Sequence, residues 1–229
     1  MMNIKKLIIP FFAVILSMSA TAQLSPYREF SVFEKNHYWV EAGATYNKTS
    51  SSSSDYKTGF RAGFGADIPL LYSSVSFLPS LVFEYKGFTN RAFVDGQWED
   101  KDVTAMYIEV PIDFSVNIPI GKKTGIQIAA GPYLAFATAG KYTESSDNYL
   151  PMYGTRTLEF YTFQKDEESE RSNLLKKFDF GVDLGVRVIF LRYVMVKLNA
   201  EFGTMNMCAI EGAQAYRNRS FSASMAFRF

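Results

Sequence analysis

Apolar and polar residues alternate with a period of two in about eight segments of this chain, and no other feature limits its fold as strongly. Residues 60–68 read FRAGFGADI, with an apolar residue at every second position, and residues 178–190 repeat the pattern. Successive side chains of a β-strand point to opposite faces, so this alternation predicts strands. The other segments that show it are residues 38–46, 75–87, 104–116, 125–138, 193–203 and 216–229.

The connections between these segments alternate between long and short. In chain order they are residues 47–58, 69–74, 88–103, 117–124, 139–177, 191–192 and 204–215. Long loops on one side and short turns on the other are typical of outer-membrane barrels, and a sheet in lipid must close to satisfy its backbone. We therefore predict an all-β fold, an eight-stranded antiparallel up-and-down transmembrane β-barrel. Its short turns and both termini would be periplasmic, and its long loops extracellular.

A secreted soluble barrel of the lipocalin kind would show the same alternation with its apolar face turned inward. Three features favour a lipid-facing apolar surface instead. The polar face is rich in glycine, as a narrow lumen requires, and it carries opposite charges that can pair inside. Aromatic residues of the apolar face gather toward the strand ends, as in the girdles at the two membrane interfaces. They include Tyr38, Tyr46, Phe77, Tyr85, Phe178, Phe190, Phe227 and Phe229.

The first 22 residues are typical of a secretory signal peptide. Lys5 and Lys6 precede an apolar run of about a dozen residues, which is shorter than a spanning helix, and small residues lead to a cleavage site after Ala22. We expect residues 1–22 to be removed, residues 23–36 to form a periplasmic segment that docks on the barrel rim, and residues 37–229 to form the barrel. No cysteine follows the predicted cut, which argues against a lipoprotein.

Charged residues of the polar face are predicted to form an ion network that plugs the lumen. Glu109 and Asp113 are four residues apart on one strand and so share a face. Buried carboxylates require partners, and Arg61, Lys86, Arg187 and Lys197 are the candidate cations. Structural filling is the first interpretation, and a proton or ligand pathway is the alternative. The predicted network comprises Arg61, Asp67, Glu84, Lys86, Glu109, Asp113, Asp183, Arg187, Lys197 and Glu201.

Two resemblances extend this interpretation. The last residues alternate and end on Phe227 and Phe229, which resembles the terminal strand that bacterial barrel-assembly machinery recognises. YIEVPI at residues 107–112, GPYL at residues 131–134 and FGVDLG at residues 180–185 resemble strands of the PorT-like outer-membrane β-barrel family. That resemblance implies an eight-stranded barrel in the outer membrane of a diderm bacterium. One member type of that family assists a dedicated protein-secretion system, so secretion-system components are possible partners.

Composition and motifs argue against several function classes. With 24 Lys and Arg against 23 Asp and Glu, the formal charge of +1 gives no field for binding nucleic acid. Histidine usually serves beside Ser, Asp or Glu in barrel enzymes, but the one histidine, His37, lies on the short-turn side. Cys208 has no His or Cys near it in sequence. We predict no enzyme activity, catalytic residue, cofactor or metal.

Three functions remain from the sequence. The first is a non-enzymatic barrel that binds a partner or supports the membrane through its loops or rim. The second is an accessory of a secretion machine. The third, a small diffusion channel, is disfavoured because an eight-stranded barrel is only wide enough for its own side chains.

Overall fold

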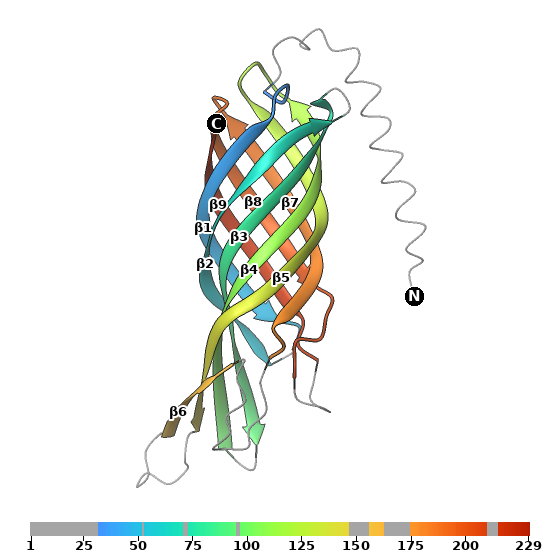
Figure 1. Cartoon of the computed structure of the whole chain (residues 1–229). Coiled ribbons are helices and arrows are strands. Elements are labelled where there is room, and N and C mark those ends of the chain that lie inside the picture. The colour runs from blue at the N-terminus through green and yellow to red at the C-terminus, as the bar shows by residue number, and fades with distance from the viewer. Residues whose placement is uncertain are drawn as a thin grey trace.

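The computed structural model describes residues 32–51, 53–70, 73–94, 97–146, 156–162, 175–209 and 215–229, and its strands form a closed barrel (Figure 1). The strands are β1 (His37–Thr49), β2 (Ser54–Leu70), β3 (Val75–Val94), β4 (Gln97–Pro119), β5 (Gly125–Ser146), β6 (Arg156–Tyr161), β7 (Phe178–Phe190), β8 (Val194–Gly203) and β9 (Asn218–Arg228). The barrel wall consists of every strand except β6. These strands pair antiparallel in the order β1-β2-β3-β4-β5-β7-β8-β9, and the pairing of β9 with β1 closes the barrel. The predicted eight-stranded barrel is confirmed. Among the described residues, no helix is long and apolar enough to span a membrane.

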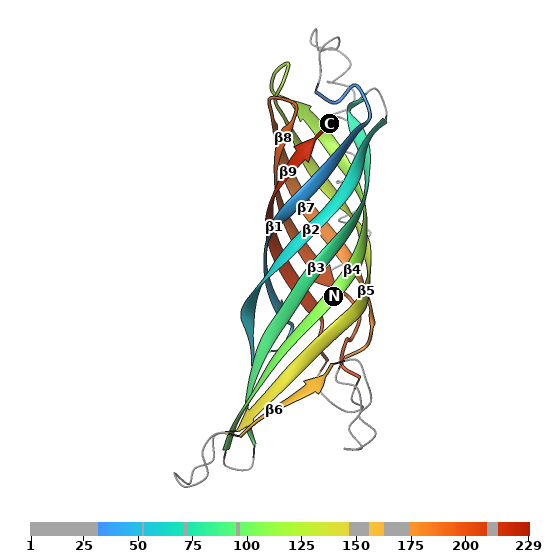
Figure 2. The same ribbon diagram turned by 60° about the vertical axis from the view of Figure 1, so that its left-hand side comes forward.

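The barrel has two different ends. We call the end where β1 begins and β9 finishes the terminal end, and the opposite end the distal end. At the terminal end, short connections join β2 to β3, β4 to β5 and β7 to β8. At the distal end, β3, β4 and β5 continue past the other strands, and β6 pairs with the extension of β5 (Figures 1 and 2). We call this projection the distal sheet; it comprises residues 89–94, 97–102, 141–146 and 156–161.

The distal sheet corrects one of the predicted connections and includes part of a second. Residues 88–103, expected to be a loop, are strand in β3 and β4 except for residues 95–96, which lie outside the described residues. Residues 139–177 were expected to be a connection in which the alternation at residues 158–163 predicted a hairpin extension of the flanking strands. They contain the end of β5 and all of β6. The physical reason is that antiparallel ladder hydrogen bonds do not depend on lipid, so a hairpin can continue into water once the apolar pattern has ended.

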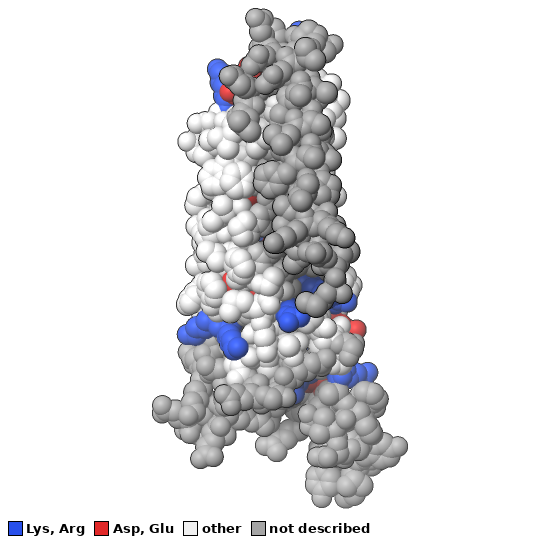
Figure 3. All heavy atoms as spheres, turned by 90° about the vertical axis from the view of Figure 1, so that its right-hand side faces the viewer, with Lys and Arg blue, Asp and Glu red and all other residues white. Residues whose placement is uncertain are grey.

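The two faces of the barrel wall follow the sequence alternation. In β7 the inward residues from Asp179 to Ile189 are buried, and the alternate residues are exposed or partly exposed. The outer surface carries large apolar side chains such as Phe64, Phe114 and Leu198, each more than half exposed. On the face shown in Figure 3, Lys and Arg gather toward the barrel ends, and the described surface between them is almost uncharged. An inward-facing apolar wall of the lipocalin kind is therefore excluded.

Candidate functional site

The middle of the lumen is filled by a lysine held among three carboxylates. Lys86 Nζ of β3 lies 2.5 Å from Glu109 Oε1, 2.7 Å from Glu201 Oε2 and 3.8 Å from Glu84 Oε1. All four side chains are at most 5% exposed. These residues come from β3, β4 and β8, so strand parity places each inside and barrel closure brings them together. The ammonium group also lies 5.3 Å from the centre of the Tyr133 ring, a cation–π distance.

Arg61 of β2 links this cluster to the rest of the lumen. Its Nη1 atom donates to Glu201 Oε1 at 3.1 Å and to Ser222 Oγ at 2.8 Å, and lies 3.6 Å from Glu84 Oε2. Its Nε atom lies 3.3 Å from Glu41 Oε1. One guanidinium therefore contacts side chains of β1, β3, β8 and β9, which are distributed around the barrel.

Further ion pairs continue toward the terminal end. Lys197 donates to Glu41, which also accepts a hydrogen bond from Trp39 Nε1 at 2.9 Å. Arg187 Nη2 donates to Asp113 Oδ2 at 2.9 Å, and its guanidinium lies 5.0 Å from the centre of the Trp39 ring.

All ten residues of the predicted network lie in the lumen and are at most 4% exposed. The structure brings nine of them into salt bridges, although Asp67 pairs with Arg228 and not with one of the four cations that the prediction considered. Asp183 instead accepts a hydrogen bond from Asn199 Nδ2 at 2.6 Å.

The prediction omitted two members of these pairs, Glu41 and Arg228. Both have the inward parity of their strands, so the sequence alternation already carried the signal that would have placed them in the network.

The terminal end of the lumen is closed by apolar side chains. Phe33 is fully buried, and its ring lies so near Gly125 that a Cβ at that glycine would be 2.5 Å from the ring. Arg228 Nη1 donates to the Val32 carbonyl at 2.8 Å while its Nη2 donates to Asp67 at 2.8 Å. The buried apolar residues at this end are Val32, Phe33, Trp39, Leu78, Ala129, Ile189, Met195 and Ala226. Val32 and Phe33 of the segment before β1 are thus part of the barrel interior; Tyr27 and Phe30 lie outside the described residues.

A second apolar cluster closes the distal end. It is formed by Phe88, Val103, Ala105, Tyr107, Tyr133, Ala135, Ala137, Tyr142, Leu175 and Met207. Leu175 and Met207 come from the connections after β6 and β8, and the Lys176 N–H donates to the Met207 carbonyl at 2.8 Å, so these connections fold over the opening. The ion network therefore lies between two apolar layers.

Gly65 shows how closely the terminal layer is packed. A Cβ at this position would lie 2.3 Å from Trp39 Cζ2, and Trp39 is only 1% exposed. We expect Gly65→Val to lower the free energy of unfolding by about 1–3 kcal/mol, because overpacking a filled core costs this much. Urea titration in detergent micelles would measure it. Gly121→Val is the control, since nothing lies within 4 Å of its Cβ; equal stability of the two variants would contradict the expectation.

The carboxylates of Glu84, Glu109 and Glu201 also meet a distance criterion for a metal site, since one oxygen from each lies within 4.8 Å of the others. The ammonium of Lys86 already lies against all three. The cation that these oxygens require is thus supplied by the protein itself, and the cluster is built for an ion pair network.

Comparison with known proteins identifies the family. The sequence matches the family described as "Outer membrane protein beta-barrel domain" over residues 21–206. The chain belongs to this family. It is thus a bacterial outer-membrane barrel, and its apolar outer surface faces the lipid bilayer. No curated protein matches it in sequence.

Several solved outer-membrane proteins are similar to this barrel. Ail, the attachment invasion locus protein of Yersinia pestis, has 9% sequence identity and a TM-score of 0.43, and the match covers 85% of this chain and 99% of Ail. Neisserial surface protein A has 15% identity and a TM-score of 0.43, with 84% and 97% covered. OprG of Pseudomonas aeruginosa has 7% identity and a TM-score of 0.43, with 86% and 97% covered.

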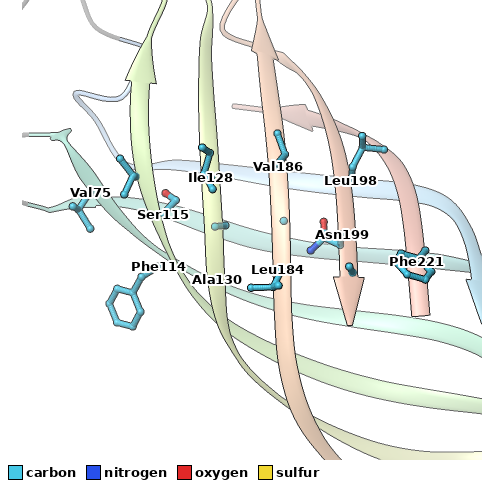
Figure 4. Close-up of a pocket in the computed structure, with 14 residues that line it drawn as sticks. Val75, Phe114, Ser115, Ile128, Ala130, Leu184, Val186, Leu198, Asn199 and Phe221 are labelled. Atoms are coloured by element: carbon cyan, nitrogen blue, oxygen red, sulfur yellow. The ribbon is translucent and has the colours of Figure 1, made fainter. Parts of the chain in front are cut away.

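An apolar hollow lies on the lipid-facing side of the outer-membrane barrel. It lies over β4, β5, β7 and β8, where the small residue Ala130 stands between larger ones (Figure 4). The larger lining residues include Phe114, Ile128, Leu184, Val186, Leu198 and Phe221, which are 42–56% exposed. None of its described lining residues is charged. Such a surface suits the hydrocarbon of the bilayer.

The two residues considered for catalysis, His37 and Cys208, lie at opposite ends of the barrel. His37 begins β1 at the terminal end, where its ring Nδ1 is 2.6 Å from the Lys35 carbonyl oxygen. Cys208 is buried at the distal end and forms no disulfide, and its backbone makes an antiparallel β-bridge with Leu175. Phe227 and Phe229, the predicted assembly signal, point outward and are 54% and 59% exposed. They form an aromatic group with Tyr38 and Tyr193 at the terminal end.

Proposed function

We propose that this outer-membrane barrel is a non-enzymatic, non-conducting protein that acts through its distal sheet and rim, by binding a partner or supporting the membrane. The observation that carries the proposal is the filled lumen. Arg61, Lys86 and Glu109 are at most 4% exposed in the middle of a barrel whose two openings are covered by apolar layers. An ion crossing this interior would have to displace paired charges and both apolar layers.

The distal sheet supports a role in contact. Its strands pair with one another beyond the end of the barrel, from Thr89↔Asp102 through Asp102↔Thr143 to the pairing of β5 with β6. Arg91 and Asp100 form a salt bridge of 3.1 Å on this sheet, with side chains 54% and 39% exposed. A stiff sheet that projects from the membrane is a suitable contact surface, because binding it does not require the order that a flexible loop would have to gain.

The sidedness follows from this proposal. The distal sheet would face the cell exterior and the terminal end the periplasm, so that the segment before β1 enters from the periplasmic side after cleavage near Ala22. The outward Phe227 and Phe229 would then be available to the barrel-assembly machinery during biogenesis.

The filled lumen predicts that the barrel conducts no ions. We expect the purified barrel to give no single-channel conductance in planar bilayers over many insertions, because the two apolar layers and the ion network leave no continuous aqueous path. A known porin inserted under the same conditions is the control. Regular steps of conductance that change when Arg61→Gln is introduced would overturn the proposal and restore the diffusion channel.

A partner can be sought with a variant that removes only the tip of the distal sheet. Arg91 and Asp100 are direct partners on β3 and β4, so replacing residues 92–99 with Asn-Gly would close the hairpin with a two-residue turn. The intact protein and this variant would be purified from the native outer membrane in mild detergent and compared by mass spectrometry. A stoichiometric companion that is lost with the variant would support the distal sheet as its contact surface.

The same purification tests the secretion accessory. The residues that carry the PorT-like resemblance include Tyr107, Glu109, Tyr133 and Asp183, all of them lumen residues at most 3% exposed. The buried residues of these motifs account for how the barrel is filled, and their alternate residues, such as Val182 and Leu184, are outward and apolar, as lipid-facing positions require. Stoichiometric secretion components in the purification would nevertheless establish the accessory role.

A further inference from the structure

Three cations lie together on the outer face of the barrel at the distal end of β1 and β9. Lys48 and Arg219 are direct cross-strand partners on the outward face, and Arg217 lies two residues beyond Arg219 with the same parity. We call these three residues the distal basic cluster. Like charges placed directly opposite one another on a sheet destabilise the pair, so this arrangement has an electrostatic cost.

No acidic side chain in the described part of the chain offsets this cost. Among the described residues, no carboxylate lies within salt-bridge distance of any of the three cations, although other cations at the same end are paired, such as Lys57 with Asp102 at 2.5 Å. Lys48 instead lies over an aromatic ring, with its Nζ 4.5 Å from the centre of the Tyr56 ring. The cluster thus presents uncompensated positive charge to the outside.

The cluster borders a group of aromatic side chains that face lipid. The pair preceding Lys48 and Arg219 toward the bilayer is Tyr46 and Phe221, and Tyr46 stacks on Tyr56 with ring centres 4.4 Å apart. Phe221 contacts Phe202 edge to face at 6.4 Å. Aromatic rings of this kind lie at the level of lipid head groups, so cations one step beyond them lie at the depth of head-group phosphates.

We propose that the distal basic cluster binds the phosphate of an anionic lipid in the leaflet that borders the distal end. A phosphate between Lys48 and Arg219 would remove their repulsion and accept charge-assisted hydrogen bonds from both. The lipid chains would lie along the apolar surface formed by Tyr46 and Phe221. The inference rests on the proposed function only in that the distal end must border the outer leaflet.

The test is native mass spectrometry of the full-length barrel in detergent with added diphosphoryl lipid A. We expect the Lys48→Gln/Arg219→Gln variant to bind this lipid about tenfold more weakly, the change that loss of about 1.4 kcal/mol produces. The matched control is Lys35→Gln/Lys123→Gln, which removes the same charge from exposed positions at the terminal end. It should bind as the unmodified protein does.

The possible results distinguish lipid phosphate from inorganic phosphate, and they distinguish the lipid site from the proposed non-conducting barrel. Weak binding by the cluster variant alone, with no displacement by excess inorganic phosphate and no comparable binding of phosphatidylcholine, would support the lipid site. Equal binding by both variants, or displacement by inorganic phosphate, would overturn it. Both variants would also be tested for folded gel mobility and for conductance, so that loss of the lipid site is distinguished from failure of the non-conducting barrel.

Discussion

Replacing Lys86 with methionine is expected to lower the free energy of unfolding by about 3–5 kcal/mol, the cost of breaking a buried ion pair by removing one partner. Lys86 is in contact with Glu84, Glu109 and Glu201, all of which stay buried when it is removed. Among the described lumen residues, eight carboxylates already face five cations. The variant would therefore leave more negative charge without a partner, while its side chain fills nearly the same volume.

The measurement is urea unfolding in detergent micelles, followed by the gel mobility of unheated samples and by tryptophan fluorescence. Lys177→Met is the control, because Lys177 is exposed at the distal end and surface substitutions change stability by about 0.5 kcal/mol or less. Adding Glu109→Gln to Lys86→Met should recover part of the loss by removing one unpaired charge. A Lys86→Met barrel as stable as the control, or no recovery in the double variant, would show that the network does not stabilise the fold.

Strand parity predicted the barrel and the side on which each charge lies, because the period of two is a local property of the chain. The distances in the lumen are not local. Lys86 meets Glu201 and Lys197 meets Glu41 only after the sheet has closed with a particular stagger between strands. The sequence therefore indicated which residues could pair and left the actual pairs open.

The β3–β4 part of the distal sheet was missed although the sequence carries a signal for it. Asp95-Gly96 stands between the polar continuations of β3 and β4, and an Asp-Gly dipeptide between two strands is a strong hairpin signal. The prediction ended the strands where apolar alternation ended, at the length needed to cross a bilayer. Apolar alternation marks only the part of a strand that faces lipid, whereas the hydrogen bonds between paired strands depend only on backbone partners.

The sequence analysis also did not predict the apolar layers at the two openings of the barrel. Trp39 and Tyr133 lie on the polar face, where the alternation alone suggested charged or small residues. Their position has a local reason, because Trp39 lies over Gly65 and Tyr133 lies over Gly181, so each large ring occupies the space that a glycine on a neighbouring strand leaves. Pairs of a ring and a glycine on adjacent strands can be recognised only once the register is known.

Replacing Phe33 with alanine is expected to lower the free energy of unfolding by about 3–5 kcal/mol, as for other fully buried phenylalanines. Phe33 is 0% exposed and precedes the first strand, yet it completes the terminal apolar layer with Trp39 and Ile189. The Arg228 guanidinium lies 5.9 Å from the centre of its ring and donates to the preceding carbonyl. Removing the ring would leave a cavity beside Gly125 and admit water to the lumen.

Tryptophan fluorescence reports on this directly, because Trp39 belongs to the same layer. We expect a red shift of its emission in the folded Phe33→Ala barrel, together with a lower urea midpoint. Ile120→Ala is the matched control, since Ile120 lies in a terminal-end connection and is 62% exposed. If both variants had the stability and emission of the unmodified protein, the segment before β1 would be a dispensable leader to the barrel. Loss of stability in Phe33→Ala alone would show that this segment is a structural part of the closed lumen, which is what its burial among strands from both halves of the chain implies.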